Sequence, residues 1–288
     1  MNPSIDRFAT SRLRSILVLL DDDAPGSARI QVAGRLAAEH DCELAGLAPT
    51  GTLQLPPGMN SAALAIDAAD TARQAALHSA HARIEPFRRL AASAGARAIS
   101  GQAVEGDTAA VLIHQAACHD VVVVSQPAPD DPLRHGALAM MERVLLNSPR
   151  PTLVVPGQGT FPTVGRRVVV AWDDGPSCVR AATDAMPLLK KAERVHLCAW
   201  RRTDEGAGII TRLEAIARWF RLHGVEAVPR VELARASIGE TLLERATALK
   251  ADVIVMGTYG HARWLERITG GVTRTALARA GIPLFMSR

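Results

Sequence analysis

Aromatic residues are scarce in this sequence: phenylalanine, tryptophan and tyrosine together make up 3% of the 288 residues. Alanine, leucine and valine must therefore fill the core. Cysteines are few as well, and the four of them lie far apart, without a CxxC pair or a Cys/His spacing that suits a metal. This argues against a disulfide framework and a zinc site. We expect buried free thiols in a reducing cytosol instead, at Cys42, Cys118, Cys178 and Cys198.

Long apolar runs are also missing. The N-terminal segment MNPSIDRFATSRLRS lacks the apolar stretch of a signal peptide, and no later segment approaches the ~20 apolar residues of a membrane span. We therefore expect a cytoplasmic protein without membrane contact. The formal net charge of +4 is small for this length, and the basic residues are scattered along the chain. No nucleic-acid-binding surface is expected from such a pattern.

The sequence contains an internal repeat. The run ILVLLDD from Ile16 matches VVVAWDD from Val168, an offset of 152 residues (168 minus 16). The run DVVVVS from Asp120 matches DVIVMG from Asp252, an offset of 132 residues (252 minus 120). The first copy is longer by a stretch that contains glycine and proline, 49–60. The repeat predicts two domains, 1–156 and 166–288, joined by a segment rich in glycine and proline.

Within each copy, short β-branched runs alternate with longer segments of helical period, which is typical of βαβ units and a parallel sheet. In the second copy we expect strands at 167–172, 194–199, 225–231, 252–256 and 283–287. Helices are expected at 177–191, 210–223, 238–249 and 270–280. Strands rich in valine and isoleucine without polar alternation should be covered on both faces. The prediction is two three-layer α/β/α domains, each with a five-stranded, mainly parallel sheet.

The last strand of each copy is apolar, near 152–155 and 283–286. An unpaired apolar edge strand is an aggregation hazard. We therefore expect the two copies to associate through these terminal strands, as an intramolecular pseudo-dimer.

Glycines are unusually spaced after the fourth strand of the second copy. Gly257-Thr-Tyr-Gly260 follows the strand, and nine residues later Gly270-Gly271-Val272-Thr273 opens the last helix. Ligands of such sheets bind beyond the carboxyl ends of the strands. Glycine lets the backbone approach a phosphate closely, and the N–H groups at a helix start favour anions. The alternative is that these glycines only turn the chain.

The pattern G-x2-G-x9-G followed by a small residue, on the last strand and helix of a five-stranded α/β domain, resembles the ATP-binding signature of the universal stress protein family. The opening Asp173 and the segment IGETLL from Ile238 also match, and the similarity covers both copies. The resemblance implies an ATP-type adenine nucleotide as cofactor, with or without Mg²⁺. The residues that it implies for binding are Asp173, Trp200, Met256, Gly257, Gly260, Gly270, Gly271, Val272 and Thr273.

Two of these residues depart from the family pattern. Gly271 stands where the family usually has Ser or Thr, so a hydroxyl that could bind phosphate is absent, although Thr273 lies close in sequence. Trp200 stands where the family usually has a smaller aliphatic residue. Adenine could stack on the indole or be crowded out by it, and a partly buried aromatic without a binding role is the alternative.

The first copy lacks the glycine pattern, because Ser125, Ala128, Leu138 and Ala139 stand in its place. Leu138 puts a side chain where the backbone would meet a phosphate. We therefore expect one nucleotide per chain, bound by the second copy, and a structural or regulatory role for the first. Asp21, Asp22 and Asp23 resemble a metal cluster, but acids between a strand and a helix more often serve as turn residues. No metal ligand is assigned.

The leading hypothesis is a nucleotide-binding stress-response regulator, which follows from the family resemblance. One alternative is an ATP-consuming enzyme on a related fold; the sequence has no GxxxxGK[ST] loop and no GxGxxG motif. No catalytic residue is assigned, and at most slow ATP hydrolysis is expected. The other alternative is an interaction protein that binds no nucleotide. The expected partners are an adenine nucleotide and a protein that the sequence does not identify, and a further homodimer stays open.

Overall fold

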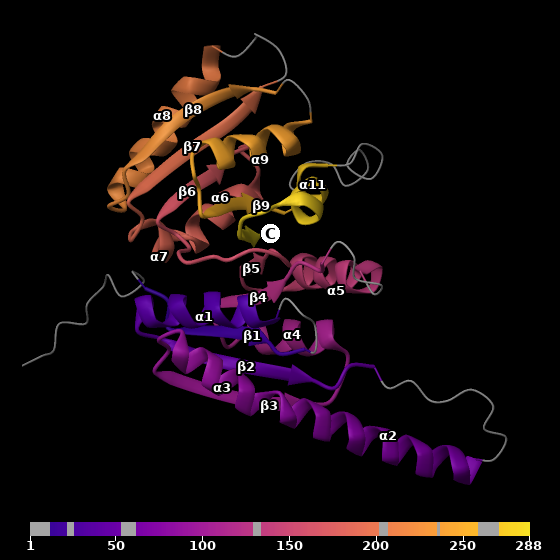
Figure 1. Cartoon of the computed structure of the whole chain (residues 1–288). Coiled ribbons are helices and arrows are strands. Elements are labelled where there is room, and N and C mark those ends of the chain that lie inside the picture. Colours follow the sequence, from indigo (N-terminus) through magenta and orange to yellow (C-terminus); the bar gives the residue numbers. More distant parts are fainter. Residues whose placement is uncertain are drawn as a thin grey trace, which may run out of the picture. The chain divides into compact units, whose positions relative to one another are not determined.

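The computed structural model describes residues 12–21, 26–52, 62–128, 134–201, 207–234, 237–258 and 271–288. The chain forms two compact units. The first unit is Arg14–Arg150, and the second is Pro151–Arg288, with which Leu13 also groups. Figure 1 shows that each unit combines helices with the strands of a sheet.

The first unit contains four parallel strands in the order β3-β2-β1-β4. They are β1 (Ser15–Leu19), β2 (Glu43–Pro49), β3 (Ala98–Val104) and β4 (Val121–Ser125). Its helices are α1 (Gly26–His40), α2 (Ala62–Ala82), α3 (Ile84–Ser93), α4 (Thr108–Ala116) and α5 (Arg134–Asn147). Helix α1 packs on α3 and α4 packs on α5.

The second unit contains six strands in the order β5-β10-β9-β6-β7-β8. They are β5 (Thr152–Val155), β6 (Arg167–Ala171), β7 (Arg194–Arg201), β8 (Ala227–Leu233), β9 (Val253–Gly257) and β10 (Leu284–Ser287). All neighbours are parallel except β5 and β10. The helices are α6 (Pro176–Asp184), α7 (Met186–Leu189), α8 (Ala207–Leu222), α9 (Ile238–Ala248) and α11 (Val272–Arg279).

The fold class expected from the sequence is confirmed, and the two units share one strand order, since β3-β2-β1-β4 corresponds to β8-β7-β6-β9. Every residue of β4, β5 and β10 is buried, as the unbroken valine and leucine runs predicted. One helix differs: the segment expected at 177–191 is divided into α6 and α7 at Ala185. Pro187 explains the break, because proline has no N–H to continue the ladder of the preceding helix.

The two terminal strands pair with each other. Strand β5 runs antiparallel to β10, with Val154 opposite Leu284 and Thr152 opposite Met286. The repeat assigns β5 to the end of the first copy, yet its contacts place it in the second unit. Both apolar strands are fully buried, so this pairing removes the exposed edge of β10.

One polar contact recurs in both units and supports the repeat. In the second unit the Asp252 carboxylate accepts hydrogen bonds from the backbone N–H groups of Gly165, Arg166 and Arg167, each at 3.0 Å. In the first unit Asp120 accepts from the N–H groups of Arg14 and Ser15, at 2.6 and 3.1 Å. The aspartate before the fourth strand of each copy thus fixes the chain that enters the first strand.

Candidate functional site

The loop after β6 is held by two adjacent aspartates. The Asp173 side chain is exposed, and its Oδ1 accepts the N–H of Gly175 at 2.8 Å, which shapes the start of α6. Asp174 has a φ of 60°, in the left-handed region, and accepts from Trp172 Nε1 at 2.9 Å and from Arg212 Nε at 3.0 Å. Desolvation would raise the pKa of Asp174, but these two hydrogen bonds and the Arg212 charge lower it overall. The loop therefore presents two carboxylates at the carboxyl ends of the strands.

Gly257 ends β9 and lies directly against the first turn of α6. A Cβ atom at this position would lie 2.6 Å from the backbone nitrogen of Cys178 and 2.8 Å from Ser177 Oγ. No side chain fits there, so the close approach of strand and helix requires glycine. This packing reason was not visible in the sequence, which suggested phosphate contact as the reason for the glycine.

Helix α11 begins beside this edge with a glycine at its N-cap. Gly271 is the N-cap and makes no side-chain hydrogen bond, Val272 is the first helical residue, and the Thr273 side chain is buried. A helix start carries N–H groups and the positive end of the helix dipole. Because Gly271 has no side-chain oxygen to accept these N–H groups, the first turn is suited to bind an anion.

Contacts with α9 fix the position of α11. A Cβ on Gly239 would lie 2.7 Å from the Cβ of Thr275, so the two helices approach as closely as glycine allows. Arg279 Nη1 also pairs with Glu240 Oε1 at 2.7 Å. Helix α9 is itself capped by Ser237, whose hydroxyl accepts the Glu240 N–H. The IGETLL segment thus acts as the support of α11.

Trp200 and Met256 have different surroundings. Met256 is buried in the sheet, opposite Met286 on β10, so its side chain belongs to the core. Trp200 lies near the end of β7 and is only partly buried, but its Nε1 atom is fully buried and has no hydrogen-bond partner among the residues that the structure describes. Its neighbour in register, Glu232, is paired with Arg245. Ser177 Oγ is likewise buried without a partner.

Parallel pairing of β9, β6 and β7 brings Asp173, Trp200 and Gly257 to the same edge of the second unit. Gly257 touches α6, and Gly271, Val272 and Thr273 form the start of α11. Gly260 and Gly270 lie outside the described residues. Two contributors were not assigned from the sequence: Ser177, which lies against Gly257, and Arg212, which bonds Asp174.

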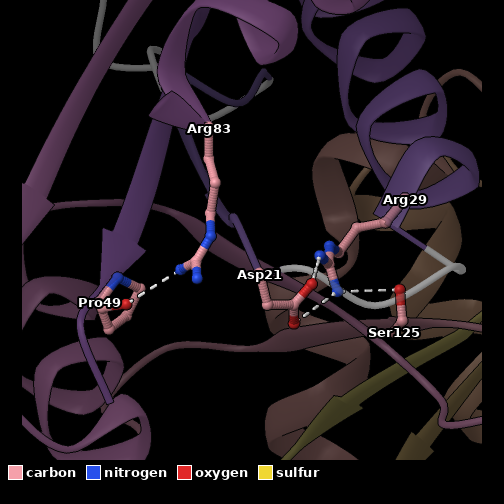
Figure 2. Close-up of polar contacts among 5 residues, drawn as sticks. All are labelled: Asp21, Arg29, Pro49, Arg83 and Ser125. Carbon is pink, nitrogen blue, oxygen red and sulfur yellow. Dashed lines mark hydrogen bonds and ion pairs between the residues drawn. The ribbon is translucent and has the colours of Figure 1, made fainter. Parts of the chain in front are cut away.

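The corresponding edge of the first unit contains a buried ion pair. Arg29 from α1 is completely buried and bonds the Asp21 carboxylate at the end of β1, as Figure 2 shows. Its Nη1 also donates to Ser125 Oγ at the end of β4, at 3.0 Å. In the same view, Arg83 Nη1 donates to the carbonyl of Pro49 at the end of β2, at 3.2 Å. Asp21 is thus bound to arginine, and Asp22 and Asp23 lie outside the described residues.

The repeat shows what Arg29 replaces. The offset of 152 residues that relates β1 to β6 places Ala181, which is also buried, at the position of Arg29. Asp21 and Ser125 hold the positions of Asp173 and Gly257. The first unit therefore has a guanidinium between the two residues whose counterparts line the carboxyl edge of the second unit.

Other site types find little support in the part of the chain that the structure describes. Within it, no group of three or more His, Cys, Asp or Glu side chains is arranged to hold a metal ion. No described helix has both the length and the apolar character that a membrane span requires. Cys42, Cys178 and Cys198 are buried free thiols, whereas Cys118 is exposed.

The chain was compared with known proteins. Residues 165–288 match the model of the universal stress protein family. This segment contains β6 to β10 and the whole of the candidate site. A universal stress protein of Synechocystis sp. is 25% identical over 171 residues, which are 59% of this chain and 58% of that protein. This chain therefore spans little more than half of that relative.

Solved structures extend the likeness to both units. A universal stress protein from Archaeoglobus fulgidus DSM 4304 superposes with a TM-score of 0.71 at 17% identity, over 95% of this chain and 96% of that chain. A functionally unknown protein from Pseudomonas aeruginosa PAO1 gives a TM-score of 0.58 at 19% identity, over 97% and 94%. At these identities the likeness shows the fold, which covers nearly the whole chain.

Proposed function

We propose that this chain is a tandem universal stress protein whose second unit binds an adenine nucleotide of the ATP type and acts in regulation of the stress response. The buried N–H of Trp200 carries the proposal. Within the described residues this donor has no partner, and leaving a buried donor unsatisfied costs about 1–3 kcal/mol. A ligand whose binding moves the atoms that cover this N–H and brings an acceptor to it would recover that cost.

The residues present fit such a ligand in two further respects. The start of α11, where Gly271 is the N-cap, offers N–H groups and a positive dipole end to phosphate oxygens. The exposed Asp173 carboxylate can accept hydrogen bonds from ribose hydroxyls or from an adenine amino group. We assign no Mg²⁺ ligand, and Gly260 and Gly270 remain predicted contacts.

Binding should be confined to the second unit. In the first unit Arg29 lies between Asp21 and Ser125 and is fully buried. A nucleotide there would have to displace a paired guanidinium from its carboxylate, and breaking a buried ion pair costs about 3–5 kcal/mol. We therefore expect one nucleotide per chain.

Isothermal titration of the full chain with ATP tests the proposal. Trp200→Phe keeps a ring but removes the N–H donor, so affinity should fall about three- to tenfold, the value of one neutral hydrogen bond. Trp219→Phe is the matched control, because Trp219 lies on α8 against Phe220 and His223, away from the site. Two equivalents per chain, or equal affinities in the two variants, would contradict the assignment.

A further inference from the structure

The second unit has an open groove at the amino ends of its strands, opposite the end that carries the candidate nucleotide site. Its volume is about 620 Å³, and its lining residues are Thr163, Arg166, Arg167, Glu193, Lys250 and Asp252. Arg167 begins β6 and Asp252 directly precedes β9. The groove is therefore separated from the candidate nucleotide site by the length of the strands.

The two acids of this groove are already engaged. Asp252 accepts three backbone N–H groups at 3.0 Å each, so its carboxylate oxygens are occupied by the chain that enters β6. Glu193 pairs with Arg166 at 3.2 Å, and both side chains are about half exposed. An exposed pair of this kind contributes only about 0–1 kcal/mol, so an incoming anion can exchange with Glu193.

The cations of the groove are in excess. Arg167 and Lys250 are exposed, and their charged groups make no hydrogen bond or ion pair within the described residues. The chain has only three lysines, and all of them lie at this edge: Lys190 and Lys191 in the segment before β7, and Lys250 before β9. The lining of the groove thus carries three basic and two acidic side chains, and Lys190 and Lys191 add positive charge close to Glu193 in the sequence.

The first unit shows that the fold does not need these cations. The amino ends of its strands are held by the same kind of contact, because Asp120 accepts the N–H groups of Arg14 and Ser15. Yet the repeat places Ser15, Glu43 and Cys118 at the positions of Arg167, Arg194 and Lys250. Helix α4 ends there without a lysine, so the helix dipole does not demand one either.

Lys250 also occupies an unfavourable backbone conformation. Its φ of 52° lies in the left-handed region, where glycine is the usual residue after a helix. A side chain in that region costs about 1–2 kcal/mol. Its N–H bonds to the Thr247 carbonyl at 2.9 Å, which fixes the direction in which the chain leaves α9. The strain is consistent with a need for the ammonium group at this place.

We infer that this amino-edge groove is a docking surface for an acidic segment of a protein partner. The attraction comes from separate, flexible side chains, which suits carboxylates spaced along a peptide. No aromatic side chain lines the groove, so a nucleic-acid base has no ring on which to stack.

Fluorescence anisotropy with labelled deca-glutamate and the full chain tests the inference. The double variant Arg167→Glu/Lys250→Glu should weaken binding about tenfold or more, because two favourable charges become repulsive. Arg14→Glu/Arg97→Glu reverses two exposed charges where strands of the first unit begin, and should bind like the parent chain. Binding should also disappear in about 1 M NaCl, where the Debye length is only about 3 Å.

Three results would overturn the inference: no binding of deca-glutamate, equal loss in both double variants, or tighter binding of a single-stranded DNA of equal charge. ATP titration of the same variants keeps this outcome apart from the proposed function. The groove variants should bind ATP as the parent chain does, because their substitutions lie at the other end of the strands. Conversely, Trp200→Phe should leave deca-glutamate binding unchanged.

Discussion

Replacement of Gly257 by alanine should destabilise the second unit. The backbone there does not have a positive φ, so alanine causes no conformational strain and only the contact with α6 matters. The added methyl would lie 2.6 Å from the Cys178 nitrogen and 2.7 Å from the Ser177 carbonyl carbon. These are backbone atoms, so the first turn of α6 must move as a unit. Overpacking of this kind costs about 1–3 kcal/mol.

Urea unfolding followed by tryptophan fluorescence measures this cost in one unit alone. All four tryptophans, Trp172, Trp200, Trp219 and Trp264, come after residue 150 and report on the second unit. With an m-value of about 2 kcal/mol/M, the midpoint should fall by about 0.5–1.5 M. Gly281→Ala is the control, because nothing lies within 4 Å of its added Cβ. Equal midpoints for the two variants would refute the packing argument.

Three further predictions concern burial. Arg29→Met should destabilise the first unit by about 3–5 kcal/mol, seen by circular dichroism, because it removes the fully buried guanidinium that pairs with Asp21; an unchanged transition would contradict the ion pair. Burial, followed by the Arg230 and Arg194 charges, lowers the pKa of His196 below its usual 6.5, so the unfolded chain binds the proton first as pH falls. Stability should be full above pH about 6.5 and decline below it, and His196→Gln should flatten this decline in urea midpoints measured across that range. A thiol reagent should modify Cys118 alone in the native chain, since burial raises the pKa of Cys178 and Cys198 to about 12 and Cys42 is buried too; rapid reaction of a second thiol would show that this core opens.

The sequence predicted the strands and helices well because each is a long, uniform pattern. Unbroken valine runs identified β4 and β9, and their shared register identified the repeat. Pairing of β5 with β10 followed from the need to cover apolar edges. The division of α6 from α7 depends on a single proline, Pro187, inside a helical pattern. The hydrophobic periodicity continues across this proline and therefore did not show that the helix is interrupted.

The site was predicted less completely, because it depends on contacts between distant residues. The glycine motif located the edge, but the approach of Gly257 to α6 requires knowing which helix lies against β9. Arg29 looked like an ordinary helical arginine, and only the fold shows it buried between Asp21 and Ser125. One signal was available: the offset of the first strands pairs this arginine with Ala181, a residue of very different size.

The two copies differ in their side chains at both ends of the central strands. Strands β1, β4, β6 and β9 are largely buried and pair in one order in both units, so core packing constrains changes within them. At the carboxyl edge, the Asp21 carboxylate is paired with Arg29, whereas Asp173 Oδ1 accepts the N–H of Gly175. At the amino edge, the aspartates Asp120 and Asp252 are kept because they fix backbone N–H groups, while the basic side chains around Asp252 have neutral or acidic counterparts in the first unit. Each edge can therefore change its chemistry without altering the other, and ligand binding at the two edges of the second unit should be independent in both affinity and stoichiometry.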